Sequence, residues 1–136
     1  MNTYRTLCSR EAFQCRNHLL RLDEDSRSAR FAARISDNTV RRYCADIDWR
    51  NTRIVGYFQD GILRAAVEVL GFNSPSSVAE LAFSVEAPFQ DKRIGTNLMV
   101  RARTFLRDRG VTRSQVFCLL TNRRMRCLAS ELHNSR

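Results

Sequence analysis

The stretch "VAELAFSVEAPFQDKRIGTNLMVRARTFLRDRG", residues 78–110, decides how the chain folds. Residues 78–87 alternate bulky apolar side chains with small or polar ones, which is typical of a β-strand with one face on a core. From Ile94 the apolar positions recur with helical spacing, and Gly110 supplies the left-handed residue that ends many helices. The stretch therefore predicts a strand, a short charged turn and a helix of about four turns.

The turn "FQDKR", residues 89–93, lies where an anion could bind. The first N–H groups of a helix have no intrahelical partner, and the positive end of the helix dipole lies behind them. Lys92 and Arg93 add positive charge, and Gly95 and Thr96 are small enough for a phosphate to approach the first helical turn. The alternative is an ordinary charged loop, because many strand-to-helix turns have this composition.

The N-terminal part of the chain reads as a short strand followed by a helix. The strand is expected at residues 4–8, and Ser9 is the expected cap of a helix in "REAFQCRNHLLRL". The apolar side chains of this helix that are expected to face the core are Phe13, Leu19, Leu20 and Leu22.

Two further short helices are expected within residues 23–49, with a break near residues 35–37. Ser26 and Ser36 are their candidate cap residues, because a serine side chain can accept a hydrogen bond from the backbone at a helix start.

A β-hairpin follows, because the pair Asp60-Gly61 between two β-rich runs is a strong signal for a tight hairpin turn. Its strands are expected at residues 53–58 and 62–70. After the long helix, "VTRSQVFCLL" at residues 111–120 predicts one more strand, and a last helix follows Asn122. The last two strands are joined by a helical crossover and should be parallel, which gives a mixed α/β fold.

Composition is that of an ordinary globular protein. The chain has 136 residues, of which 43% are hydrophobic and 27% charged, so one domain covering residues 1–136 is expected. No apolar run approaches the length of a membrane span and no secretory leader is seen, so a cytoplasmic protein is expected. The five cysteines have no ligand spacing, and we expect reduced thiols and no metal site.

A net charge of +9, carried by 22 arginines and one lysine, favours an anionic partner such as nucleic acid or a phosphorylated cofactor. The alternative is a solvated basic surface, because the positive charges are spread along the chain. His18 and His133 have no partner at triad or ligand spacing and are expected to be structural or on the surface.

From about residue 21 to residue 129 the chain resembles the GNAT superfamily of acetyl-CoA-dependent N-acetyltransferases. The family's central motif falls on Gln90, Arg93 and Gly95, within "AELAFSVEAPFQDKRIGTNLM", and the later "LLTNRRMRCLA" is similar to the family's strand-asparagine-helix ending. The resemblance implies a mostly antiparallel sheet with one splayed parallel pair, in which the pantetheine arm of acetyl-CoA extends the sheet.

Cofactor-binding residues follow from the same resemblance. It implies that Ser84 and Val85 lie along the pantetheine and that Asn122 meets the cofactor near the next helix. Gln90, the first residue of the motif, is also implied to bind the cofactor. The residues whose amides would bind the pyrophosphate are Lys92, Arg93, Ile94, Gly95 and Thr96. The acceptor implied is a primary amine of a small molecule or a protein, attacking the thioester directly.

The attacking amine must be neutral, so a base has to take up its proton. Glu80 matches the glutamate of the family's "AEL" strand and is the first candidate, Glu86 at the strand end is the second, and Glu68 on the neighbouring strand is the third. The alternative for Glu80 is an exposed carboxylate paired with an arginine.

Two departures from the family pattern stand out. Arg93 replaces the first glycine of the motif. With an ordinary φ an arginine is tolerated there and its guanidinium could fold over a phosphate, whereas a required positive φ would mean a remodelled loop. The tyrosine that often protonates the thiolate is absent near residues 127–131. The family usually continues with two more strands, so either the chain is a shortened copy, or a partner protomer supplies the missing wall, or the acid is water or another residue. A shortened end is expected to leave an exposed sheet edge that favours a homodimer. The competing hypothesis is a non-catalytic module that binds CoA, or nucleic acid through its basic surface.

Overall fold

The computed structural model describes residues 1–73 and 78–116. The elements in chain order are β1 Asn2–Thr6, η1 Ser9–Glu11, α1 Ala12–Arg21, α2 Glu24–Phe31, α3 Asp37–Ala45, β2 Thr52–Gln59, β3 Ile62–Leu70, β4 Val78–Val85, η2 Ala87–Phe89, α4 Ile94–Asp108 and β5 Arg113–Val116.

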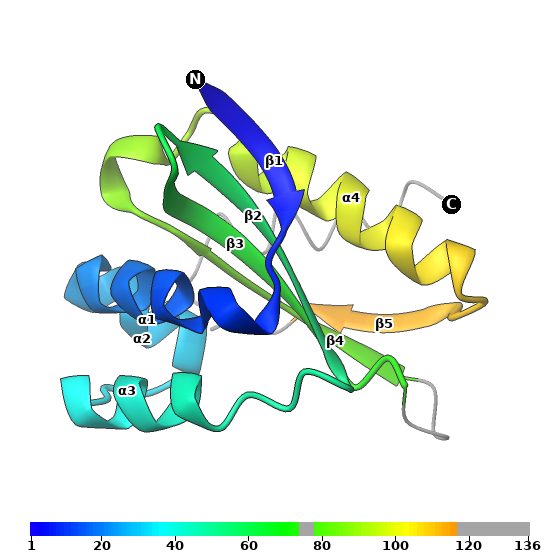
Figure 1. The fold of residues 1–136 in the computed structure, drawn as a ribbon, viewed down its shortest axis with the longest axis horizontal. Coiled ribbons are helices and arrows are strands. Elements are labelled where there is room, and N and C mark those ends of the chain that lie inside the picture. Colours follow the sequence, from blue (N-terminus) through cyan, green and yellow to red (C-terminus); the bar gives the residue numbers. More distant parts are fainter. Residues whose placement is uncertain (74–77, 117–136) are drawn as a thin grey trace.

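The strands form a five-stranded sheet in the order β1-β2-β3-β4-β5 (Figure 1). The first four strands pair antiparallel, and β4 pairs parallel with β5 in a register that runs from Val78 opposite Arg113 to Leu81 opposite Val116. The expected mixed α/β fold is confirmed. The parallel pair follows from the crossover through α4, which returns the chain to the sheet in the same direction.

The hairpin between β2 and β3 turns at Asp60 and Gly61, as expected. Both residues have positive φ, 51° and 80°, which is the backbone that a tight two-residue hairpin turn requires. The register then shifts, because Tyr57 pairs with Ala65 whereas Phe58 pairs with Leu63. The residue left over, Arg64, forms a β-bulge, a device that re-aims a side chain.

Helices cover both faces of the sheet (Figure 1). On one face, α4 packs Leu98, Met99 and Leu106 against residues of β2, β3 and β4 such as Val67 and Leu81. These side chains all belong to one buried cluster. The spacing of the α4 residues is the helical period that the sequence showed.

On the opposite face, α1 and α3 bury a second cluster against β2 and β3. Its members include Leu19 of α1, Val40 of α3, and Ile54, Phe58 and Leu63 of the hairpin. The side chains of β4 alternate between the two faces, so its even-numbered residues lie on the α1–α3 face and its odd-numbered ones on the α4 face.

Several helix starts differ from the sequence expectations. Ser9 opens a 3-10 turn, and α1 begins only at Ala12. The N-cap of α2 is Asp23, whose side chain accepts from the Ser26 amide, so Ser26 lies inside the helix. The expected core residue Phe13 is 49% exposed, whereas the predicted cap Ser36 is confirmed for α3.

Some expectations fall outside the described residues, namely the strand beyond Val116, the last helix, Asn122 and His133. Within the part that is described, Cys15 and Cys44 are buried and Cys8 is exposed, all three as free thiols. No helix of residues 1–73 or 78–116 combines the length and the apolar character needed to cross a membrane.

Candidate functional site

The turn between β4 and α4 has a backbone that exposes the start of the helix. Asp91 and Arg93 both adopt left-handed conformations, with φ of 61° and 63°. Arg93 is the N-cap residue of α4, and its side chain makes no capping hydrogen bond. The first N–H groups of a helix form hydrogen bonds with a cap, with water or with a ligand. Because Arg93 provides no side-chain cap, the start of α4 is suited to binding an anion.

Arg93 carries a conformation that arginine rarely adopts. The sequence left open whether a residue other than glycine at this motif position would take ordinary φ or keep positive φ, and the structure keeps positive φ. For an L-residue the left-handed region costs roughly 1–2 kcal/mol relative to glycine's easy access to it. The turn is therefore held in shape by its surroundings.

Gln90 is one source of that support. Its side-chain amide donates to the carbonyl oxygen of Val85 at 2.9 Å and to Ser26 Oγ at 3.0 Å. These two bonds connect the turn to the end of β4 and to α2. In the structure Gln90 thus positions the turn from behind.

The remaining residues that are predicted to bind the pyrophosphate lie in the same turn and at the start of α4, and they differ in their exposure to solvent. Lys92 and Arg93 are exposed, Gly95 and Thr96 are half-buried, and Ile94 is 5% exposed because it packs into the core under α4. Exposed cations beside small first-turn residues leave room for a doubly charged phosphate group.

A second feature of the β4 end is a buried array of polar side chains. His18 of α1 is 0% exposed; its Nδ1 lies 2.9 Å from Glu86 Oε2, and its Nε2 lies 2.8 Å from Ser84 Oγ. Ser84 and Glu86 are each 5% exposed. A serine hydroxyl, an imidazole and a carboxylate are thus connected in sequence by hydrogen bonds.

Two arginines complete the environment of Glu86. Arg21 Nε donates to Glu86 Oε2 at 3.1 Å, and Arg64, from the bulge in β3, donates to Oε1 at 3.0 Å. Burial by itself would raise the pKa of Glu86, but the hydrogen bonds from His18 and Arg21 outweigh it and lower the pKa. Glu86 is therefore an ionised acceptor, and a poor direct base because it holds its proton weakly.

Glu68, the third predicted carboxylate, lies in a separate buried cluster on the same face. It is 0% exposed and accepts from Arg30 Nε at 3.0 Å and from Tyr43 Oη at 2.5 Å. Burial is the largest cause, and the charge of Glu68 the next, of a raised pKa at Tyr43. Since one Glu68 oxygen accepts from Arg30 of α2 and the other from Tyr43 of α3, this carboxylate holds both helices to the sheet.

Glu80, the first predicted base, is exposed near the start of β4, where it pairs with Leu70 of β3 and Gln115 of β5. Ala82, Ser84 and Glu86 follow on the same face at the spacing of alternate strand residues. The structure thus places Glu80 in solvent and Glu86 in the buried array, at opposite ends of one strand face.

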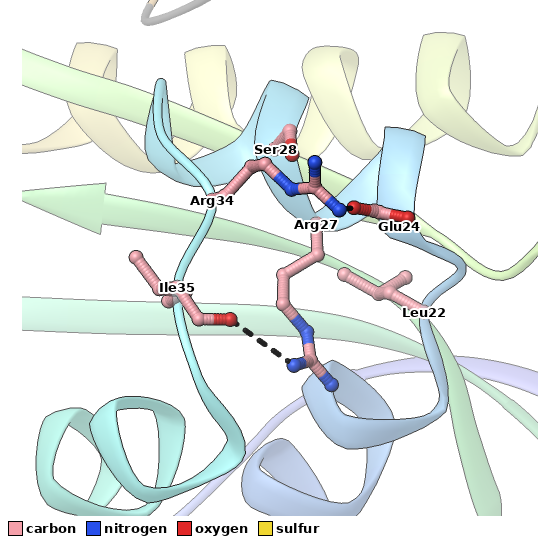
Figure 2. Close-up of a pocket in the computed structure, with 6 residues that line it drawn as sticks. All are labelled: Leu22, Glu24, Arg27, Ser28, Arg34 and Ile35. Atoms are coloured by element: carbon pink, nitrogen blue, oxygen red, sulfur yellow. Dashed lines mark hydrogen bonds and ion pairs between the residues drawn. The ribbon is translucent and has the colours of Figure 1, made fainter.

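A pocket of about 310 Å³ lies beside α2. Figure 2 shows Glu24 and Arg34 meeting as an ion pair, with Leu22 and Ile35 on either side of Arg27. Its α2 residues Glu24, Arg27 and Ser28 share one helix face, whereas Ser26, which contacts Gln90, lies on the opposite face. The pocket is therefore separate from the turn that begins α4.

Sequence reasoning missed the array around His18. The missed partners of the predicted residues Ser84 and Glu86 are His18, Arg21 and Arg64. A signal existed, because a histidine at the helical spacing of Cys15, Leu19 and Leu22 must be buried and a buried imidazole needs partners. In residues 1–73 and 78–116 no group of three or more His, Cys, Asp or Glu side chains is arranged to bind a metal ion.

Comparison with known proteins places this geometry in context. A family model described as the acetyltransferase (GNAT) family matches residues 9–132. No curated protein matches the chain in sequence.

Solved structures resemble the fold closely. The GNAT domain of S. lividans PAT is 21% identical with a TM-score of 0.78, and the match covers 94% of this chain and 78% of that one. The ribosomal-protein-alanine N-acetyltransferase of Brucella melitensis biovar Abortus 2308 is 16% identical with a TM-score of 0.70, and the match covers 97% of this chain and 90% of that one. The PaiA N-acetyltransferase of Thermoplasma acidophilum, in complex with coenzyme A, is 14% identical with a TM-score of 0.69, and the match covers 97% of this chain and 88% of that one. At these identities the similarity shows the fold.

Proposed function

The chain belongs to the acetyltransferase (GNAT) family, and we propose that it transfers the acetyl group of acetyl-CoA to a primary amine of a small molecule or a protein. The bound cosubstrate supplies an acetyl thioester, which an amine can attack without any metal. The residues of this chain then have three tasks. They bind the cosubstrate, admit a neutral amine and move one proton.

The observation that carries this proposal is the uncapped start of α4. Arg93 caps the helix without a side-chain hydrogen bond, and Asp91 and Arg93 both adopt left-handed conformations in the turn. Successive N–H groups in such a turn form a concave seat for an anion. We propose that the amides of Lys92 to Thr96 bind the pyrophosphate there.

The strand β4 is the proposed neighbour of the pantetheine arm. It pairs with β3 from Glu80 to Val85, and the described pairing with β5 runs from Val78 to Leu81. We propose that Ser84 and Val85 lie beside the pantetheine and that a backbone N–H near Val85 polarises the thioester carbonyl, as oxyanion-type donors do. Asn122, outside the described residues, is proposed as a further cofactor contact.

An amine acceptor agrees with the exposed carboxylate of Glu80, which lies toward the start of β4. Glu80 is exposed on the β4 face that also carries Ser84, so its carboxylate can attract an ammonium ion or accept a proton from it. Among similar structures, one protein is named a ribosomal-protein-alanine N-acetyltransferase, and an aminoglycoside acetyltransferase was solved with sisomicin. On this basis we propose a primary amine as the acceptor. An amine on a small molecule and an amine on a protein agree equally well with these observations.

A thiol-release assay over a panel of amines tests the proposal. The panel should hold peptides with free N-termini, lysine peptides, polyamines and aminoglycosides, each mixed with acetyl-CoA. We expect at least one amine to release CoA thiol together with a product heavier by one acetyl group in mass spectrometry. Thiol release that does not depend on any amine, or none at all, would contradict transfer. Full activity in Glu80→Gln would remove Glu80 from the role of base.

A further inference from the structure

Ser84, His18 and Glu86 form a hydrogen-bonded chain that leads from β4 into the interior. Its distances are 2.8 Å from Ser84 Oγ to His18 Nε2 and 2.9 Å from His18 Nδ1 to Glu86 Oε2. We propose that this chain is the proton relay of the reaction, with Ser84 as the group that meets the amine and His18 as the residue that holds the proton. The inference rests on the proposed acetyl transfer.

The tautomer of His18 follows from its partners. The ionised carboxylate of Glu86 can only accept hydrogen bonds, so Nδ1 must carry a hydrogen. In the neutral imidazole Nε2 is then the acceptor, and the Ser84 hydroxyl donates to it. The lone pairs of Ser84 Oγ are left to accept a hydrogen bond from an incoming amine.

The array keeps its hydrogen bonds in both protonation states. When Nε2 gains a proton, it becomes the donor and Ser84 Oγ becomes the acceptor across the same 2.8 Å contact. Nδ1 continues to donate to Glu86, whose negative charge then faces the imidazolium directly. Without this exchange of donor and acceptor, the fully buried His18 ring could take up a proton only by losing a hydrogen bond or by moving.

Glu86 contacts two arginines as well as His18, which is more than an ion pair with a single partner provides. Arg21 also donates to the carbonyl oxygen of Leu63 at 2.7 Å, which anchors its guanidinium. The bulge in β3 aims Arg64 at the other oxygen, Oε1. Both charged groups hold Glu86 in one orientation, and the carboxylate in turn holds the His18 ring, so His18 and Glu86 act through Ser84 as positioning residues.

Ser84 lies at the point where this array meets the proposed acyl site. It is adjacent to Val85, whose carbonyl oxygen is bonded by Gln90 of the anion-binding turn. Its side chain faces α1, on the side of the sheet opposite to α4. The proton would thus leave on one side of β4 while the phosphates are held at the start of α4.

The amine nitrogen forms a bond to the thioester carbon and passes one proton to Ser84 Oγ, while the hydroxyl proton of Ser84 moves to His18 Nε2. The C–S bond then breaks with its electron pair on sulfur. The proton returns from His18 through Ser84, directly or by way of water, and the thiol is released with the array in its starting state.

Nitrogen NMR tests the array without any turnover. The chain has two histidines, so the variant His133→Gln leaves His18 as the one imidazole to be observed. We expect its Nδ1 to carry the hydrogen and its Nε2 to accept a hydrogen bond, and we expect the Nε2 signal to move in Ser84→Ala. An imidazolium at the pH of activity, or the hydrogen on Nε2 of a neutral ring, would overturn the relay.

Kinetics provide the second test. In Ser84→Ala and His18→Gln we expect kcat to fall by roughly a hundredfold, the scale of a lost acid-base group, with little change in KM for acetyl-CoA. Thr52→Val is the matched control, because it also removes one buried hydroxyl, 7% exposed, and lies in β2 outside the array. If His18→Gln does not fold, as thermal unfolding will show, Ser84→Ala alone decides the question.

The outcomes separate this inference from the proposed function. If the wild-type protein transfers acetyl groups and Ser84→Ala keeps its kcat, the relay is wrong and the acetyltransferase stands. If the wild-type protein binds no CoA and acetylates no amine, both fall. A loss of kcat in Ser84→Ala that Thr52→Val shares equally would also contradict the relay, because the loss would then follow from burial alone.

Discussion

The side-chain amide of Gln90 lies 2.9 Å from the carbonyl oxygen of Val85 and so joins the turn before α4 to the end of β4. The second bond of Gln90, to Ser26 Oγ, adds α2 to the same junction. The strand that would lie along the pantetheine and the turn that would bind the pyrophosphate are therefore held in one geometry by one residue. A change at Gln90 should therefore affect cofactor binding through the geometry of this junction.

Gln90→Leu should weaken CoA binding. Each of the two lost hydrogen bonds contributes about 1 kcal/mol, so the dissociation constant should rise by roughly fivefold to thirtyfold. Calorimetry with CoA measures this. Gln14→Leu is the matched control, because Gln14 also bridges backbone groups, Gly61 O at 2.8 Å and Leu63 N at 3.2 Å, on the hairpin turn. Equal weakening in both variants would contradict a specific role for Gln90.

Arg93→Gly should be more stable than Arg93→Ala. Both variants lose the guanidinium, but only glycine adopts a φ of 63° without steric cost. The difference in free energy of unfolding should be about 1 kcal/mol in favour of glycine. Urea unfolding of the two variants measures it, and equal stability would show that the left-handed conformation of Arg93 is not under strain. If the guanidinium folds over a phosphate, both variants should also bind CoA more weakly than the wild type.

Glu68→Gln should destabilise the protein severely. Its partner Arg30 is 6% exposed and would be left with its charge uncompensated, at a cost of about 3–5 kcal/mol. Chemical denaturation measures the loss. Glu24→Gln, which breaks the exposed pair with Arg34, is the control and should cost less than about 1 kcal/mol. Similar losses in the two variants would mean that the Glu68 cluster does not stabilise the fold.

Acid should weaken the N-terminal junction through Glu11. The paired hydrogen bonds from Arg5, at 2.9 and 2.7 Å, lower the pKa of Glu11 from 4.5 to about 2. Because the folded-state pKa lies below the unfolded value, this stabilisation is complete above pH 4.5 and is lost as the pH falls to about 2. The effect should be well below ~1 kcal/mol, since the pair is exposed to solvent.

Unfolding midpoints at several pH values between neutrality and pH 2 check this prediction. Glu11→Gln should show a shallower fall in stability than the wild type over that range, since glutamine does not titrate. A fall of the same steepness in both proteins would show that Glu11 contributes nothing to the acid sensitivity.

Elements set by local signals could be predicted from the sequence. The Asp60-Gly61 pair fixes the hairpin because its turn needs two residues of positive φ. The period of the apolar residues from Ile94 and the stop at Gly110 define α4 to within two residues of its observed end at Asp108. The parallel pairing of β4 with β5 followed from the crossover alone.

The candidate site was only partly predictable, because its contacts join segments that are far apart in the chain. His18 and Glu86 are 68 positions apart, and their contact depends on which face of α1 docks on the sheet. The expected face included Phe13, which is 49% exposed, whereas the buried stripe passes through Cys15 and His18. The left-handed conformation of Arg93 was unpredictable for a different reason, since arginine adopts it rarely and only where tertiary contacts impose it.

The central claim is that the start of α4 binds the pyrophosphate of acetyl-CoA, and calorimetry of CoA binding to Thr96→Glu tests it most directly. A glutamate in the first helical turn interacts favourably with the helix dipole, so this variant should fold at least as well as the wild type. Its negative charge, however, repels phosphate. Val100→Glu adds the same charge to α4 at a position that is 54% exposed and serves as the control. We predict saturable binding to the wild type and to Val100→Glu, and at least tenfold weaker binding to Thr96→Glu, about 1.4 kcal/mol. No saturable heat with the wild type, or equal affinity in all three proteins, would contradict the claim.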